Sequence, residues 1–331
     1  MERIAIIGSG IAGLAAAREL SRSPGRRVTL FEAGWHFGGH ANTVDVTLAG
    51  VEHGVDTGFL VYNERTYPRL VRLFAELGVP AAASDMSFSV QVPDALGQAP
   101  LEWSGSSLGA VFCQRGNLLR PRFWRMLRDL LRFNTLATEL AGSDRSDHLQ
   151  PLGAFLQLHG FSREFRDWYL LPMIGCIWSS PGEDMLRFPA GALARFCHNH
   201  GLLQVMDRPQ WLTVAGGSRE YVRRIVERIA DKRLNTPVLR IRRNGGGAAV
   251  TTDGRIEQFD RLVLATHPDQ ALALLADASP RERAVLGDIK YRTNHAVLHT
   301  DPSMLPRNPR AFEIPRRPRA RRVATRSACT T

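Results

Sequence analysis

The hydrophobic positions at the start of the chain change from a strand-like run to a helical repeat and back. Arg3–Ile7 is a short apolar run rich in isoleucine, which is typical of a buried parallel strand. Alanine and leucine recur at helical spacing over Leu14–Leu20, and Val28–Phe31 forms a second strand-like run. Strand, helix and strand in this order predict an α/β fold that is built on a parallel sheet.

The next segments predict a hairpin and a helix before the chain leaves this first lobe. Thr43–Leu48 and Val51–Val55 alternate well enough for a hairpin. Thr66–Leu77 has large apolar residues at helical spacing, and Gly78 is a typical helix stop. Two further strand-like runs, which we assign to a second lobe, are Ser87–Val92 and Leu101–Trp103.

From about Ser106 to Asn199 the pattern is helical, which predicts a largely helical insertion. Pro121 is well placed to open the first helix because proline is favoured at the first helical position. The expected helices run from Arg122 to about Leu140, over Pro151–Leu158, over Ser162–Ile177 and over Gly191–His200.

After the insertion the pattern returns to the first lobe at Trp211–Gly217. The elements expected there are a helix over Ser218–Ile229, a hairpin of Thr236–Arg242 and Ala248–Thr252, a buried strand over Arg261–Thr266, and helices over Pro268–Leu275 and Pro280–Leu286. Tyr291–Thr300 is then expected to be a strand of the second lobe.

A complete G-x-G-x-x-G sequence follows the first strand directly. Gly8 allows a tight turn, Gly10 lets the backbone approach a pyrophosphate, and Gly13 lets the helix lie close to the strand. Glu32 ends the second strand, where a carboxylate accepts hydrogen bonds from both hydroxyls of an adenosine ribose. This order predicts a dinucleotide-binding site, and a glycine-rich turn without a ligand is the alternative.

Paired glycines and a D-x-G sequence follow this acid, as Gly38-Gly39-His40 and Asp56-Thr57-Gly58. With these residues the sequence resembles the superfamily of flavin-containing amine oxidases, protoporphyrinogen oxidases and phytoene desaturases. Within it, the chain looks most like bacterial proteins known only as predicted NAD/FAD-binding proteins. The resemblance covers about Met1 to Phe312 and implies FAD as the cofactor. His40 stands where relatives commonly carry arginine, so its contact to the pyrophosphate would be weaker and pH-dependent.

The resemblance implies FAD contacts that are spread over the first lobe. In relatives, a valine like Val238 offers backbone hydrogen bonds to adenine, and a strand like Arg261–Thr266 ends in small residues beside the nucleotide. The expected cofactor-binding residues are Gly8, Ser9, Gly10, Ala12, Gly13, Glu32, Ala33, Gly39, His40, Thr57, Gly58, Val238 and Thr266.

The expected fold is a Rossmann-like FAD/NAD(P)-binding domain with an inserted, largely helical α+β substrate lobe. We place the FAD-binding domain at 1–78 and 211–288, the substrate lobe at 79–210, and a return strand of that lobe within 289–312. Residues 313–331 are an Arg- and Pro-rich tail without apolar periodicity, which is expected to be disordered. The abrupt change of composition indicates a shifted reading frame or a truncation, with an evolved basic arm as the alternative. A truncated chain would be expected to bind FAD poorly.

Composition adds little to this picture. The net charge is +11, but the last nineteen residues hold six arginines and one glutamate, and the rest of the excess is almost entirely arginine. No nucleic-acid-binding motif accompanies the charge, so we expect no nucleic-acid partner. The four cysteines lack C-x-x-C spacing and histidine partners at metal-ligand spacing. They predict reduced thiols, no metal site and a cytoplasmic protein.

One segment of the insertion leaves contact with a membrane open. Arginines interrupt an apolar stripe that is formed by Phe123, Trp124, Leu127, Leu130 and Leu131. Such a stripe favours a helix that packs on its own lobe. Peripheral attachment to the inner membrane is the alternative.

Lys290 is the candidate catalytic residue, because its local sequence is similar to that of the lysine that holds a water at flavin N5 in amine oxidases. A solvated surface lysine is the alternative. The expected function is that of an FAD-dependent oxidoreductase taking a hydride from a C–N or C–C bond onto flavin N5. Its substrate would be an apolar, lipid-like or amine small molecule, and its electron acceptor is unknown. An NAD(P)-dependent dehydrogenase and a catalytically impaired nucleotide-binding remnant are the alternatives.

Overall fold

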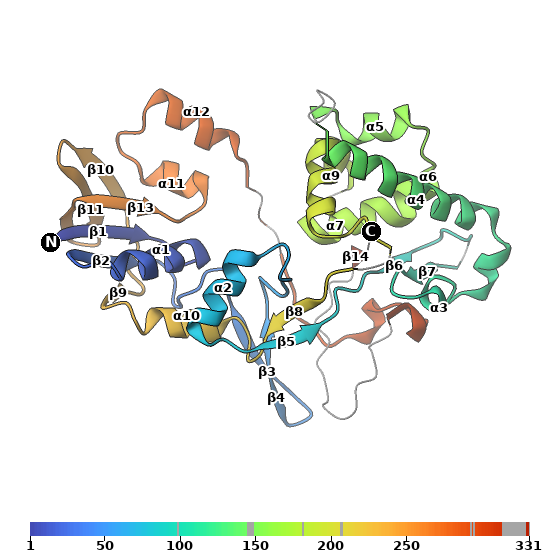
Figure 1. The fold of residues 1–331 in the computed structure, drawn as a ribbon, viewed down its shortest axis with the longest axis horizontal. Helices are drawn as coiled ribbons and strands as arrows, with labels where there is room; N and C mark the ends of the chain where they lie inside the picture. The colour runs from blue at the N-terminus through green and yellow to red at the C-terminus, as the bar shows by residue number, and fades with distance from the viewer. Residues whose placement is uncertain are drawn as a thin grey trace. The chain divides into compact units, whose positions relative to one another are not determined.

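The computed structural model divides into two compact units, each built from segments that are far apart in the sequence (Figure 1). It describes residues 1–97, 99–143, 149–180, 182–205, 208–291, 293, 295–312 and the backbone of 329–330. Unit 1 consists of Met1–Tyr62, Tyr67–Ala83 and Leu212–Ala296. Unit 2 consists of the described residues among 63–66, 84–211 and those from 297 onward.

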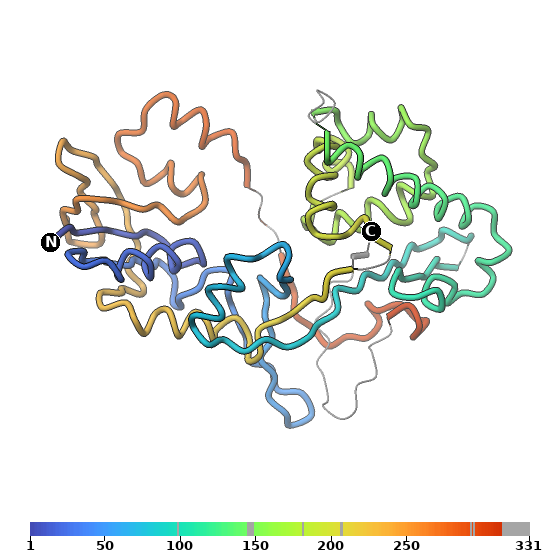
Figure 2. Tube along the Cα trace, viewed as in Figure 1, coloured from blue at the N-terminus to red at the C-terminus, as the bar shows by residue number. Residues whose placement is uncertain are grey.

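A parallel sheet forms the centre of unit 1, with the strand order β13-β1-β2-β9. Its strands are β1 (Glu2–Ile7), β2 (Arg26–Phe31), β9 (Asp231–Arg233) and β13 (Arg261–Leu264). Helix α1 (Ile11–Ser21) connects β1 to β2. Ile4 of β1 lies between Val28 and Arg261 in the register, so the start of the chain pairs with a strand from its last quarter. Figure 2 shows this pairing as a blue segment beside an orange one.

Antiparallel hairpins and helices complete unit 1. Hairpin β3 (Thr43–Leu48) and β4 (Val51–Asp56) matches the expected one, and α2 (Pro68–Leu77) ends at Gly78 in the left-handed conformation. The remaining elements are β10 (Arg240–Asn244), β11 (Gly247–Thr252) and β12 (Arg255–Phe259) in one sheet, the paired strands β5 (Ala81–Ser84) and β8 (Trp211–Val214), and the helices α10 (Arg219–Val226), α11 (Pro268–Leu274) and α12 (Pro280–Asp288).

Unit 2 is largely helical and packs around an aromatic core. Strands β6 (Ser89–Val92) and β7 (Leu101–Ser104) pair with each other, and β6 also pairs with the two-residue strand β14 (Cys329–Thr330). Trp103 of β7 is buried among helices and donates its indole N–H to the carbonyl of Trp168 at 3.1 Å. The helical segments are α3 (Leu108–Val111), η1 (Arg115–Leu119), α4 (Pro121–Ala141), α5 (Leu152–Leu158), α6 (Arg163–Phe165), η3 (Arg166–Leu170), α7 (Leu171–Trp178), α8 (Gly182–Leu186), α9 (Ala190–Asn199), η4 (Pro302–Met304) and η5 (Pro309–Phe312).

The structure corrects three expectations about the elements. The described residues of 291–300 form no strand, so the return strand expected at Tyr291–Thr300 is wrong. The helix expected over Ser162–Ile177 is interrupted by the π-helical segment η3. The short strand β9 and the third strand β12 were not expected.

The α/β fold class itself is confirmed, while the division into functional domains stays a prediction. The compact units change over at residues 83/84, 211/212 and 296/297, and they also assign 63–66 to unit 2. The expected disorder of 313–331 falls on residues outside the described ones, except that Cys329 and Thr330 are in strand β14. Within the described residues, none of the helices has both the length and the apolar character that crossing a membrane requires.

Candidate functional site

The turn between β1 and α1 gives its three motif glycines different surroundings. Gly8 has a φ of +98°, and a Cβ placed on it would lie 2.6 Å from the carbonyl oxygen of Ala265. A Cβ on Gly13 would lie 1.9 Å from the carbonyl oxygen of Gly8, so this position needs glycine. A Cβ on Gly10 would meet nothing within 4 Å. Gly8 and Gly13 therefore close the turn, and Gly10 faces open space.

The start of α1 offers backbone donors to a ligand. Gly10 is the N-cap residue, and no side chain caps the helix. The first N–H groups of a helix have no partner within it, and they carry the positive end of the helix dipole. This open and uncapped helix start fits the pyrophosphate of a dinucleotide. Ala12 is exposed in this first turn.

Glu32 is held by the turn that it faces. Its Oε2 accepts the backbone N–H of Ser9 at 2.9 Å and also the Ser9 hydroxyl, while its Oε1 accepts the N–H of Gly34 at 2.8 Å. A carboxylate has about four acceptor positions, so three of them are already used. Glu32 can therefore receive one ribose hydroxyl in this geometry, whereas the sequence led us to expect two.

Ser9 is a connector between loops in this structure. It is fully buried, and its hydroxyl oxygen accepts the N–H of Gly38 at 3.1 Å while donating to Glu32. Its carbonyl also lies 3.1 Å from the Gly38 N–H. Since its hydrogen-bonding groups serve the protein, Ser9 shapes the site, and a direct contact to the cofactor stays a prediction.

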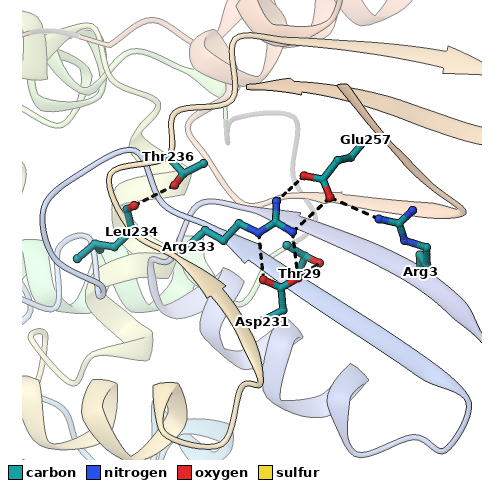
Figure 3. A network of polar contacts seen from close by, with 7 residues as sticks. All are labelled: Arg3, Thr29, Asp231, Arg233, Leu234, Thr236 and Glu257. Atoms are coloured by element: carbon teal, nitrogen blue, oxygen red, sulfur yellow. Dashed lines mark hydrogen bonds and ion pairs between the residues drawn. The ribbon is translucent and has the colours of Figure 1, made fainter. Parts of the chain in front are cut away.

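Two residues after α10 support the Glu32 backbone. Arg233 belongs to the unexpected strand β9, and Thr236 is the expected start of a hairpin strand that begins only at Arg240 in the structure. The N–H of Glu32 donates to the carbonyl of Arg233 at 2.9 Å, and its carbonyl accepts the N–H of Thr236 at 2.8 Å. Arg233 is at the centre of the network in Figure 3, where it binds Asp231 at 3.0 Å and also Glu257.

This network also shifts the acid–base properties of its members. Hydrogen bonding to Arg233 lowers the pKa of Glu257. For Asp231, burial raises the pKa, but hydrogen bonds from Arg233 and Thr29 outweigh it and leave the pKa below its ordinary value. The guanidinium of Arg233 also lies 5.0 Å from the centre of the Phe31 ring, so it joins β9 to β2.

The paired-glycine loop and the D-x-G turn pack against the same place. A Cβ on Gly39 would lie 3.1 Å from the Cα of Gly10, and one on Gly58 would lie 2.1 Å from the carbonyl oxygen of His40. Thr57 is exposed, and its N–H donates to the carbonyl of Asn42 at 2.9 Å. The structure thus brings together Gly10, Gly39, His40 and Gly58, while their contacts to the cofactor stay a prediction.

Asp56 has a role that the sequence reasoning missed. Its Oδ1 accepts hydrogen bonds from the N–H and hydroxyl of Ser218, at 2.9 and 2.7 Å, and from the hydroxyl of Thr43 at 2.6 Å. It thereby ties the β3–β4 hairpin to the start of α10. In the sequence, only the aspartate of the D-x-G motif could have indicated this role.

Three aromatic rings form a stack beside this loop. The rings of His40 and His267 are 5.7 Å apart and nearly parallel, and those of His267 and Tyr291 are 4.3 Å apart. His267 follows Thr266 at the end of β13, and Thr266 lies against Gly8. The sequence reasoning selected His40 and Thr266 but not the other two rings.

Three predicted residues lie at the margin of the site. Val238 is buried in the core cluster that contains Ile7 and Phe31, the last residues of β1 and β2. Ala33 is exposed next to Glu32. Lys290 is exposed and donates to the carbonyl of Gly287 near the end of α12, which is the behaviour of a surface lysine. Its catalytic role stays a prediction.

Neither metal ligands nor disulfides contribute to this arrangement in the part of the chain that the structure describes. The described residues contain no group of three or more His, Cys, Asp or Glu arranged to hold a metal ion. Cys113 and Cys197 are free thiols. Burial raises the pKa of the Cys197 thiol to about 12, so it stays protonated at neutral pH.

Comparison with known proteins also indicates a dinucleotide cofactor, and it identifies the family. The model of the family of flavin-containing amine oxidoreductases matches residues 11–298. Carotenoid phi-ring synthase of Streptomyces griseus is 30% identical and aligns over 91% of this chain and 58% of its own length. A protein of Mycobacterium tuberculosis named as a flavin-containing monoamine oxidase is 27% identical over 83% of this chain and 59% of its own length.

Solved structures show the same fold. Cyclohexylamine oxidase of Brevibacterium oxydans superposes with a TM-score of 0.65 at 22% identity, over 87% of this chain and 63% of that one. This chain thus spans less than two thirds of the length of these relatives.

A flavin is the cofactor of the matching family, so the prediction of FAD is confirmed. With its glycine-lined turn, its acid after β2 and its matching segment of 288 residues (11–298), the chain belongs to the family of flavin-containing amine oxidoreductases.

Proposed function

We propose that the protein is an FAD-dependent oxidoreductase that takes a hydride from a C–N or C–C bond of an amine or apolar substrate. The observation that carries this proposal is the open space at Gly10, directly before the uncapped start of α1. The chemistry that FAD supplies when bound is acceptance of the hydride at flavin N5.

The residues of this chain would hold the nucleotide end of the cofactor. The N–H groups at the start of α1 would face the pyrophosphate, and the remaining acceptor position of Glu32 would take a ribose hydroxyl. The names of two relatives support the substrate class, since one concerns carotenoids and the other monoamines. Membership in a flavin-dependent family favours FAD over a nicotinamide nucleotide.

A pair of glycine variants tests the cofactor site. Neither Gly10 nor Gly245 has an atom within 4 Å of an added Cβ, and neither has a positive φ. Gly10→Val and Gly245→Val should therefore both fold, but only Gly10→Val should lose FAD, because its side chain occupies the pyrophosphate position. The measurements are the flavin-to-protein ratio and the rise of Tm on adding FAD.

Turnover of amines with an artificial electron acceptor then tests the reaction. A colourless wild-type protein that FAD does not stabilise would contradict the cofactor assignment. A yellow protein that no amine or apolar substrate reduces would contradict the reaction while leaving the cofactor assignment intact.

A further inference from the structure

The N-terminal half of α4 and the segment before it carry more positive charge than the neighbouring carboxylates neutralise. Between Gly105 and Arg128 the sequence has five arginines and no acidic residue. Arg125 and Arg128 have side chains that are 53% and 72% exposed. Two buried carboxylates neutralise part of this charge: Asp129 lies 3.6 Å from Arg128, and Glu164 lies 2.7 Å from Arg122 and 4.0 Å from Arg125.

Large apolar side chains are exposed among these arginines. Leu119 at the end of η1 is 88% exposed, Trp124 is 48% exposed, and Leu131 is 55% exposed. Trp124, Arg128 and Leu131 are spaced by four and three positions, so they share one face of α4. We call Leu119, Trp124, Arg125, Arg128 and Leu131 the α4 face. The helix is drawn in green in Figure 1.

The rest of α4 shows that this exposure is not a general property of the helix. Phe123 and Met126 are fully buried in the core of unit 2, and Leu127 and Leu130 are partly buried against it. The packed stripe expected from the sequence is therefore correct for Phe123, Leu127 and Leu130. Trp124 and Leu131 are not among the buried residues of that core, and about half of each side chain is exposed.

The polar group of Trp124 is satisfied within the protein. Its indole N–H donates to the carbonyl of Leu118 at 2.9 Å, and its ring lies 5.3 Å from that of Phe112. The ring can therefore leave water without losing a hydrogen bond. Tryptophan, leucine and arginine side by side are the composition of helices that lie in the interface of a bilayer.

We propose that the α4 face docks onto an anionic lipid bilayer. The exposed leucines and Trp124 enter the boundary between headgroups and acyl chains, and the arginines contact the phosphates of anionic lipids. The charge decides between lipid and other occupants, because five arginines beside two buried carboxylates leave a net positive surface. Such a surface complements an anionic membrane and repels a second copy of itself. The proposal goes beyond the assigned oxidoreductase activity and does not depend on it.

Vesicle binding by the full chain tests this proposal. The protein should sediment with vesicles of phosphatidylcholine mixed with phosphatidylglycerol, but not with phosphatidylcholine alone, and added salt should weaken binding. Brominated lipids should quench tryptophan fluorescence, and the Trp124→Phe variant should lose most of this quenching.

Matched variants separate the α4 face from the remaining surface. Arg125→Gln and Arg128→Gln should each weaken binding about fivefold, and Leu119→Ser about tenfold. Arg187→Gln and Leu158→Ser, at positions of unit 2 that are 80% and 72% exposed, should leave binding unchanged. Three results would overturn the proposal: no binding to anionic vesicles, equal loss in the control variants, or a dimer in solution that Leu119→Ser dissociates.

Discussion

At the scale of single residues, the site depends on whether a polar group faces the protein or a ligand. Glu32 does both, because it binds Ser9 and Gly34 and keeps about one acceptor position. Ser9 faces only the protein. A motif match shows that a residue is present, but only the contacts show which of these tasks it performs.

We expect Glu32→Ala to lower both the stability of the FAD-free protein and its affinity for FAD. The loss of hydrogen bonds to a charged acceptor costs about 1.5–3 kcal/mol, which corresponds to about ten- to a hundredfold in affinity. Tm without FAD should also fall, because Ser9 and Gly34 lose their partner. FAD titration and thermal unfolding measure the two effects, with Glu139→Ala on the exposed side of α4 as the control. Unchanged retention of flavin would remove Glu32 from the site.

Lys290→Met tests the candidate catalytic residue. The lysine is exposed and donates to the Gly287 carbonyl, so we expect normal flavin content and an unchanged rate of flavin reduction by substrate. The measurement is stopped-flow reduction under anaerobic conditions. A slower reduction with FAD still bound would instead assign Lys290 to the chemistry.

At the scale of elements, the network around Arg233 makes the stability of unit 1 depend on pH. The carboxyl groups of Asp231 and Glu257 have lowered pKa values in the folded protein. Their contribution is therefore complete above the ordinary pKa of glutamate, 4.5, and is lost as the pH falls through the lower folded values.

Arg233→Met should reduce this dependence. We expect the free energy of unfolding to drop by about 1–3 kcal/mol at neutral pH and to change less between pH 6 and pH 3, scales typical of charged hydrogen bonds and carboxylate titration. Urea unfolding at a series of pH values measures both. A variant with the same pH profile as the wild type would show that the network contributes no pH-dependent stability.

The same elements show how far the sequence could predict the fold. The strands β1 and β2, the β3–β4 hairpin and α4 have local periodicity, so they were predicted with nearly correct bounds. Strand β9 reads Asp-Lys-Arg and has no apolar run. It is a strand because it pairs with β2 and because Arg233 packs on Phe31, which are contacts between distant residues.

The strand wrongly expected at Tyr291–Thr300 shows the opposite case: apolar residues are present, but no neighbouring strand pairs with them in the described part of the chain. The segment Tyr291–Thr300 has Val297 and Leu298, both exposed, and its described residues pair with no strand. Local pattern cannot show whether a neighbouring strand is available. In the site, the positions of Gly10, Glu32 and Gly58 followed from motifs, whereas the bonds of Asp56 required the folded structure.

At the scale of the whole molecule, a buried carboxylate joins two segments of unit 2 that are far apart in the sequence. Glu102 of β7 is 2% exposed and accepts the N–H groups of Arg307 and Asn308, at 2.8 and 2.9 Å. The Asn308 side chain also donates to the carbonyl of Cys113 at 2.8 Å. These bonds attach the segment around Arg307 to β7, although Arg307 and Glu102 are 205 residues apart in the sequence.

Glu102→Gln should release this segment. The amide replaces one acceptor by a donor that faces a backbone N–H, which costs about 1–3 kcal/mol. We expect faster hydrogen exchange at residues 307–311 and earlier cleavage there by trypsin, with Glu139→Gln as the exposed control. Equal protection in both variants would show that other contacts hold the segment.

The interleaved composition of unit 1 also sets the order in which the chain can fold on the ribosome. β1 and β2 emerge first, but β13, which covers the other edge of β1, is synthesised only after segment 84–211 of unit 2. An unpaired edge can associate with other nascent chains, so β1 needs protection during this interval. Although the dinucleotide-binding sheet begins the chain, its translation must run past residue 264 before that sheet can close.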